Sequence, residues 1–158
     1  MKKAIEMGLS FGLTSGVITT LGLIIGLYFG THSKLAIVGG ILTIAVADSL
    51  SDATGIHVSA EADKKITKKD IWRSTLSTFW AKFIFALSFL IPVLIFGLKT
   101  AIIISIIYGL FLVAGLSYYI SKKNGHKTSK VIKEHLIIVI VVIILTYLIG
   151  IFISQFFS

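Results

Sequence analysis

The sequence contains no cysteine, a single proline and few charged residues. Without cysteine there are no disulfides, thiolate metal sites or cysteine nucleophiles, so any bound metal must use oxygen or nitrogen ligands. Charged residues make up only 14% of the 158 residues, whereas 56% are hydrophobic, and the mean hydropathy is +0.98. One soluble core of this size cannot hide so much apolar surface, so we expect lipid to be the main solvent.

Five apolar runs are each long enough to cross the hydrocarbon layer of a bilayer as an α-helix, which takes about 20 residues. They cover residues 8–30, 35–60, 75–98, 101–120 and 135–157. The first run is full length, so we expect it to stay in the protein rather than to be removed as a signal peptide. The sequence therefore predicts an all-α polytopic membrane protein, with residues 1–158 forming a single transmembrane domain of five helices.

The formal charge of +8 is distributed unevenly along the chain. Twelve of the 15 basic residues precede the first run or lie in the second and fourth connections: Lys2, Lys3, Lys64, Lys65, Lys68, Lys69, Arg73, Lys122, Lys123, Lys127, Lys130 and Lys133. The other two connections hold only Lys34 and Lys99. Because cytoplasmic loops are enriched in Lys and Arg, this pattern predicts a cytoplasmic N-terminus in the cell membrane, and it does not indicate a nucleic-acid partner.

Asp48 and Asp52 stand inside the second apolar run, where charged side chains are costly. Their four-residue spacing puts both carboxylates on one face of a helix, and Ser59 and Asp63 continue this stripe toward the cytoplasmic end. Two carboxylates this close ionise together only with a compensating cation or a shared proton. The pattern therefore indicates a metal or proton site. An ion pair with Lys82, at about the same depth in the third run, is the alternative explanation.

Four further residues are candidates for ligands or for a polar path. His57 and Glu61 are also four residues apart, on the opposite side of the helix from the aspartates. They suit a divalent metal, and a hydrogen-bonded pair near the interface explains them as well. Glu6 is a candidate metal ligand at the cytoplasmic mouth, or a charge that complements the helix dipole. Thr14 belongs to a group of hydroxyls that either line a path or bond to a neighbouring helix.

Two series of glycines spaced by four residues occur in the first run. They are Gly8, Gly12 and Gly16, followed by Gly22, Gly26 and Gly30. Small residues at this spacing let another helix backbone approach closely. We therefore expect a homodimer through this helix.

Pro92 is the only proline of the chain. It removes a backbone hydrogen bond and clashes one turn back, so we expect a kink in the third helix. Carbonyls around Ser88 would then be free to meet a hydroxyl, water or an ion.

Four segments resemble, in this order, the vacuolar iron transporter family: GLSFGLTSGVITTLGLIIGL, SAEAD, STLSTFWAKFIFALSFLIPVLIFG and LTYLIG. The resemblance implies five helices with a cytoplasmic N-terminus, a homodimer with the first helix at the interface, and export of ferrous or manganous ions in exchange for protons. The chain departs from the family at Phe11, where the family has an acidic residue, and at Leu50, where it has methionine. A short basic connection also replaces the acidic metal-binding domain of the eukaryotic members.

We interpret the sequence as a transporter that exports a divalent metal, Fe²⁺ or Mn²⁺, through Asp48 and Asp52. The surroundings of the aspartates lack the glycine and arginine framework of alcohol phosphatidyltransferases, and no GxGD protease motif is present, so we expect neither an enzyme nor a permanent cofactor. A non-transporting dimeric scaffold or sensor of the same fold is the alternative, because Phe11 and Leu50 replace two pathway ligands.

Overall fold

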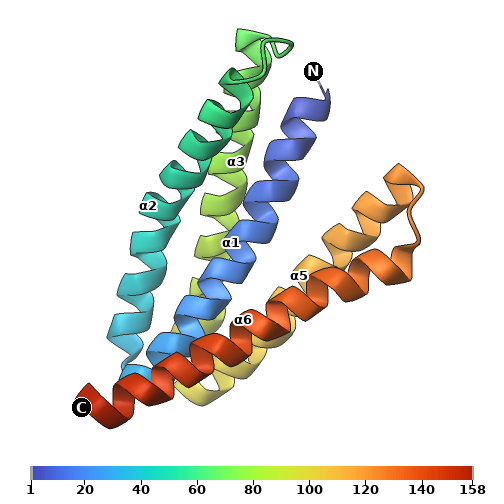
Figure 1. Ribbon diagram of the computed structural model, residues 1–158. Coiled ribbons are helices and arrows are strands. Elements are labelled where there is room, and N and C mark those ends of the chain that lie inside the picture. The colour runs from blue at the N-terminus through green and yellow to red at the C-terminus, as the bar shows by residue number, and fades with distance from the viewer. Residues whose placement is uncertain (1, 158) are drawn as a thin grey trace.

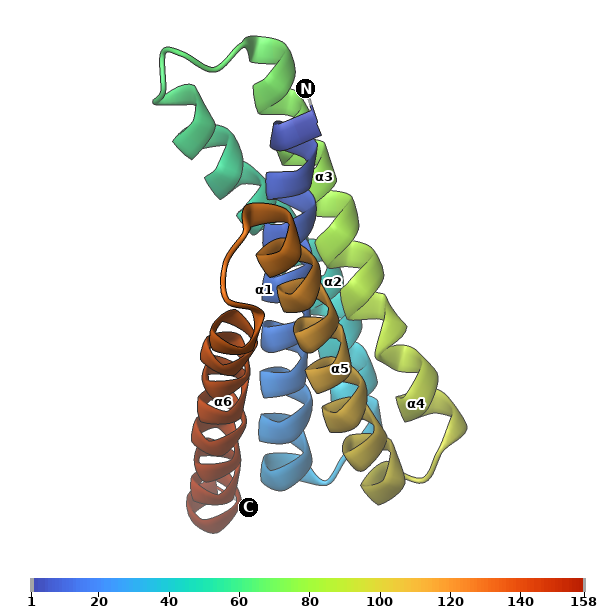
Figure 2. The same ribbon diagram turned by 90° about the vertical axis from the view of Figure 1, so that its right-hand side faces the viewer.

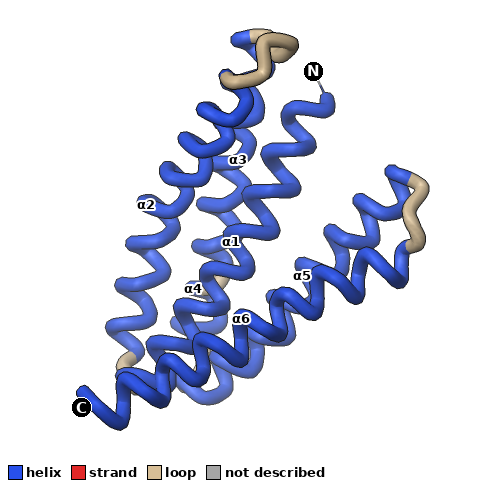
Figure 3. Tube along the Cα trace, viewed as in Figure 1, coloured by secondary structure: helices blue, strands red, loops and turns tan. Residues whose placement is uncertain are grey.

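The computed structural model describes residues 2–157, and within this range every regular element is a helix (Figure 3). The helices are α1 (Lys2–Thr31), α2 (Lys34–Glu61), α3 (Lys68–Ser88), α4 (Leu90–Ile95), α5 (Leu98–Asn124) and α6 (Thr128–Phe157). Since α3 and α4 together form one span, the described chain has five helical segments long and apolar enough to cross a membrane. The prediction of an all-α, multi-pass membrane protein is confirmed.

The central helix is α1, which packs against α2, α3, α5 and α6. In Figure 1, α2 and α3 lie on one side of α1 and the α5–α6 pair on the other, and the two sides diverge toward the end that holds the N-terminus. We call this the N-terminal end of the bundle; it also holds the α2–α3 and α5–α6 connections (Figures 1 and 2). The α1–α2 connection and the C-terminus lie at the opposite end. The basic connections therefore share one end of the bundle.

Both glycine series of α1 lie against helices of the same chain. In the first series, a Cβ atom at Gly12 would lie 2.5 Å from the backbone oxygen of Thr78 on α3. The second series faces α6, where a Cβ atom at Gly150 would lie 2.7 Å from the backbone oxygen of Gly26. Close approach of backbones is the use expected of such residues. The surface from which we predicted a homodimer is thus occupied within the protomer, and the dimer itself stays a prediction.

The apolar core is centred on α1, whose Val17, Leu21 and Ile24 are fully buried. They contact buried side chains of α2, the α3–α4 span, α5 and α6. In contrast, α6 buries only Val139 and Gly150 among its described residues. Most of its Ile, Leu, Val and Phe side chains therefore face outward, where lipid is the solvent that such a surface requires.

The helices extend beyond the apolar runs at most of their ends. The third span begins at Lys68 rather than at residue 75, because Thr67 caps α3: its hydroxyl accepts a hydrogen bond from the Asp70 amide at 3.2 Å. It ends at Ile95 rather than at residue 98. Near that end, the Lys34 ammonium donates to the backbone oxygen of Leu94 at 3.1 Å, satisfying a carbonyl that has no partner within the helix.

The third span is interrupted at Phe89, where α3 ends and α4 begins, less than one turn before Pro92, the residue at which we expected a kink. The Ser88 hydroxyl donates to the backbone oxygen of Phe85 at 2.6 Å and accepts from the Tyr108 hydroxyl at 3.1 Å. A hydroxyl of α5 therefore does reach the break, but it bonds to the side chain of Ser88 rather than to the carbonyl that Pro92 leaves free.

Candidate functional site

Lys82 lies near the middle of the third span, and its side chain is only 1% exposed. Its ammonium nitrogen lies 2.5 Å from Oδ2 of Asp52 and 2.6 Å from Oδ2 of Asp48. Both aspartates lie near the middle of α2. The sequence-based alternative of an ion pair between Asp52 and Lys82 is therefore confirmed, and the same ammonium also pairs with Asp48.

A hydroxyl of α1 completes this cluster. The Lys82 ammonium donates to Oγ of Ser15 at 2.9 Å, and the Ser15 hydroxyl donates to Oδ2 of Asp52 at 2.6 Å. Ser15 thus contacts both partners of the ion pair, and three helices contribute to one polar cluster. We refer to Ser15, Asp48, Asp52 and Lys82 together as the triad cluster, after its three charged groups.

The local sequence explains why these groups meet. Asp48 and Asp52 share a face of α2 because residues four apart lie one above the other on a helix. Lys82 reaches α1 because Gly16 has no side chain: a Cβ atom there would lie 3.1 Å from Cγ of Lys82. Ser15 directly precedes this glycine. The first glycine series therefore brings α3, and with it the ammonium, close enough to bond with Ser15.

The charges of the triad cluster do not balance. Two carboxylates face one ammonium, and the salt bridges found among residues 2–157 include no second cation for either aspartate. An unpaired charge in a low-dielectric region is strongly unfavourable. With both carboxylates ionised, the cluster carries one more negative than positive charge.

Access to the cluster is one-sided. The side chains of Asp48 and Asp52 are 30% and 21% exposed, whereas the Lys82 side chain between them is buried. The carboxylates, and not the ammonium, are therefore the part of the cluster that reaches the surface of the chain.

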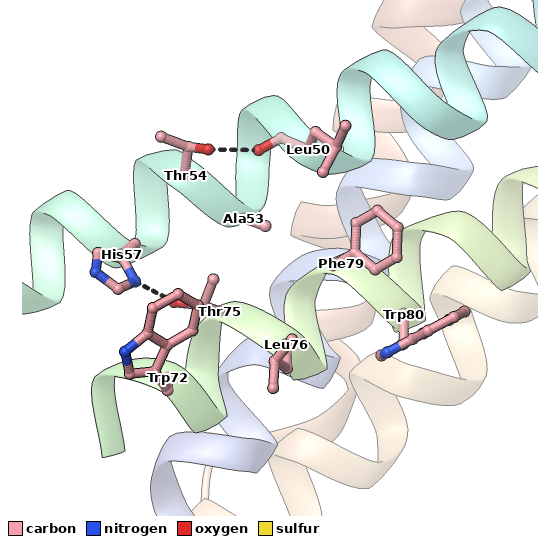
Figure 4. Close-up of a pocket in the computed structure, with 9 residues that line it drawn as sticks. All are labelled: Leu50, Ala53, Thr54, His57, Trp72, Thr75, Leu76, Phe79 and Trp80. Atoms are coloured by element: carbon pink, nitrogen blue, oxygen red, sulfur yellow. Dashed lines mark hydrogen bonds between the residues drawn. The ribbon is translucent and has the colours of Figure 1, made fainter. Parts of the chain in front are cut away.

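The second pair of candidate ligands lies closer to the N-terminal end. Nδ1 of His57 lies 3.0 Å from the hydroxyl oxygen of Thr75, and the two atoms share a hydrogen bond (Figure 4). The imidazole ring packs edge-on against Trp72. Glu61 is the exposed last residue of α2. His57 thus bonds across to α3 rather than to Glu61. It lines an apolar groove of about 490 Å³ between α2 and α3, together with Trp72 and Trp80.

The remaining candidates lie apart from the triad cluster. Asp63 lies beyond the end of α2, is exposed and accepts from the Lys65 amide at 2.9 Å, so helical periodicity no longer places it on the stripe of Asp48. Glu6 pairs with Lys123 of α5. Thr14 is half-buried, and its neighbour Ser15, rather than Thr14, reaches the aspartates.

A metal site built only from charged or imidazole ligands is not present in the described part of the chain, since no three His, Asp or Glu side chains there lie close enough to share an ion. The predicted ligands fall instead into separate places: the aspartates, the His57 groove and the Glu6 ion pair. Only the aspartates converge on one point. Ser15 is the ligand-type residue that sequence reasoning did not select, because nothing in the sequence distinguishes it from the other hydroxyls of α1.

Comparisons of the chain with protein families, with curated proteins and with solved structures find no match. The triad cluster and the membrane-spanning fold are therefore the features from which a function can be inferred.

Proposed function

We propose that the protein is a secondary transporter that moves a cation across the membrane, with Asp48 and Asp52 as its exchangeable site. The observation that carries this proposal is the charge imbalance of two carboxylates that share one ammonium near the middle of the membrane span. Intramembrane acids that are incompletely paired are typical of ion and proton pathways. A site with an excess of negative charge binds a cation more readily than a balanced ion pair does.

The transported cation, on this proposal, is a divalent metal, Fe²⁺ or Mn²⁺, which is exported in exchange for protons. Carboxylate and hydroxyl oxygens suit hard divalent cations of this kind. The resemblance of the sequence to vacuolar iron transporters supports the same class of substrate. Protons complete the exchange because a carboxylate that loses its metal regains charge balance by taking up a proton.

The proposed orientation places the N-terminal end of the bundle in the cytoplasm of a cell whose plasma membrane holds the protein. The support is the clustering of basic residues in the α2–α3 and α5–α6 connections, which share that end (Figure 1).

A homodimer through α1 is part of the proposal, but its interface is not the glycine surface. Met7 and Phe11 of α1 are 46% and 42% exposed, and Thr19 is also exposed. These residues share one helix face with Ser15, because they follow at four-residue steps. A second copy on this face would therefore border the triad cluster.

Transport of metal by purified protein in liposomes tests the proposal. Fe²⁺, Mn²⁺, Co²⁺ and Zn²⁺ are offered under a proton gradient, and metal and proton movements are recorded together. We expect the wild type to exchange at least one of these metals for protons and the double variant Asp48→Asn, Asp52→Asn to exchange none. Full exchange by the double variant would reject the site.

The alternative is a non-transporting dimeric scaffold or sensor of the same fold. The burial of Lys82 favours it, because a sealed ammonium between two carboxylates also serves as a permanent structural connection of α2 and α3. A wild type that moves no cation in the liposome assay, but remains folded, would favour this alternative.

A further inference from the structure

The Lys82 ammonium is the point on which the oxygens of the triad cluster converge. Oδ2 of Asp52, Oδ2 of Asp48 and Oγ of Ser15 lie 2.5, 2.6 and 2.9 Å from this nitrogen. Hard divalent cations bind oxygens at about 2.0–2.6 Å. A cation at the position of the nitrogen would therefore contact both carboxylates with little movement of α2.

The ammonium and a metal ion cannot share this position. Both are positive, and at such separations in a low-dielectric region their repulsion is large. Each also satisfies the same carboxylate oxygens. Occupation by Lys82 and occupation by a metal therefore exclude each other.

Residues of α1 hold the Lys82 side chain and offer its ammonium a hydrogen-bond acceptor apart from the carboxylates. Gly16 holds the stem of the side chain against α1, since only the missing Cβ leaves room for Cγ of Lys82. Ser15, the residue before this glycine, already accepts a hydrogen bond from the ammonium. When a metal displaces the ammonium from the carboxylates, Ser15 stays as an acceptor, so the ammonium keeps one partner.

We infer that Lys82 is a built-in competitor for the cation site, which holds both aspartates when no metal is bound and which the metal must displace. The inference deepens the proposed function and rests on it for the identity of the cargo. Its consequence is selectivity: a divalent cation offers two charges in place of one to the two carboxylates, whereas a monovalent cation offers no more charge than the ammonium it must displace. Lys82 thus favours divalent over monovalent cations and lowers the affinity for both.

Binding of Mn²⁺ to the purified protein in detergent tests this inference. Lys82→Met and Lys82→Gln both remove the charge, and the glutamine amide keeps an N–H donor for the carboxylates if the methionine variant does not fold. We expect these variants to bind Mn²⁺ at least about tenfold more tightly than the wild type, which corresponds to about 1.4 kcal/mol. Lys82→Arg keeps the charge and should bind Mn²⁺ as weakly as the wild type.

Lys99→Met is the matched control, because Lys99 is an exposed lysine in the first turn of α5, at the opposite end of the bundle from the basic connections. It should leave Mn²⁺ binding unchanged. Folded Lys82→Met or Lys82→Gln protein that binds Mn²⁺ no more tightly than the wild type would overturn the inference.

The outcome for transport is separable from the outcome for binding. If the wild type exchanges metal for protons but neutral variants at Lys82 gain no affinity, the competitor role fails and the proposed function stands. If the neutral variants gain affinity but the wild type moves no metal, the competition for a cation site is supported and transport is rejected.

Discussion

Gly12 of α1 lies so close to α3 that a Cβ atom there would come within 2.5 Å of the backbone oxygen of Thr78. Backbone atoms in the middle of a helix cannot move aside independently, so any side chain at this position must push α1 and α3 apart. The same pair of helices contributes Ser15 and Lys82 to the triad cluster, which makes the close approach a condition for the site.

Gly12→Ala should therefore lower the stability of the protein by about 1–3 kcal/mol, the usual cost of inserting atoms into a packed interior. Gly55→Ala on α2 is the matched control, because a Cβ atom there meets nothing within 4 Å. An alanine in open space is neutral or stabilises a helix by up to about 1 kcal/mol. Thermal unfolding in detergent, followed by circular dichroism, compares the two variants. Equal melting temperatures would contradict the close packing of α1 on α3.

The ion pair predicts a strong coupling between Lys82 and Asp52. Lys82→Met should destabilise the protein by about 3–5 kcal/mol, because it leaves two carboxylates without their buried counter-charge. Adding Asp52→Asn should recover much of this loss, since only one carboxylate then remains without a counter-charge. A double-mutant cycle on thermal stability measures the coupling, which should be well above that of distant residues. Additive effects of the two substitutions would show that the pair contributes nothing specific.

Mn²⁺ should also raise the melting temperature of the Lys82→Met variant more than that of the wild type. The physical reason is that stabilisation by a ligand grows with the logarithm of the ratio of its concentration to its dissociation constant, so tighter binding gives a larger shift at the same concentration. A melting series at increasing Mn²⁺ concentration makes the comparison. NaCl at matched ionic strength is the control, because a monovalent cation should not displace the ammonium. The absence of any Mn²⁺-dependent difference would argue against a metal site between the aspartates.

Asp48→Asn and Asp52→Asn should each abolish metal-driven proton movement in liposomes. Each substitution replaces one of the two carboxylates of the cluster with a neutral amide. An amide does not take up a proton when the metal leaves, so the exchange of metal for protons should stop. Glu61→Gln serves as the comparison, because Glu61 is exposed at the end of α2 and should affect the exchange only modestly. The assay records pH inside the liposomes after metal is added outside. A larger effect of Glu61→Gln than of either aspartate substitution would move the site to the end of α2 that holds Glu61.

The orientation of the bundle is open to a direct test, since the chain has no cysteine of its own. A cysteine at position 68, in the first turn of α3, should resist an impermeant thiol reagent in intact cells, because the proposed orientation places the basic connections in the cytoplasm. A cysteine at position 99 should react, because it lies at the other end. Labelling of position 68 alone would invert the proposed topology.

Hydropathy predicted the five spans because each must expose apolar side chains to lipid along its whole length. It did not predict the ends of the helices, because helices continue into water wherever a cap and polar residues allow. Lys68 and Thr67 illustrate this at the start of α3, where the helix begins well before the apolar run. Pro92 was expected to disturb the third span, and the helix is interrupted at Phe89 because proline removes a hydrogen bond and clashes within the turn that precedes it.

At the site, sequence reasoning placed Asp48 and Asp52 on one face and identified Lys82 as a partner at similar depth. These inferences depend only on spacing within helices. The shared ammonium and the hydroxyl of Ser15 depend on how three helices cross, which the sequence does not state. The glycines of α1 were correctly interpreted as a close-packing surface, but the sequence alone did not reveal that the partner helices belong to the same chain.

The central position of α1 means that part of its surface stays uncovered while the protein is being synthesised. Of the five spans, α1 leaves the ribosome first, yet its second glycine series pairs with α6, which leaves last. During synthesis this surface must therefore remain against lipid or a chaperone until the final span has been inserted. A chain halted after α5 would contain the complete triad cluster but would leave one side of its central helix uncovered, so it should be a target for membrane quality control.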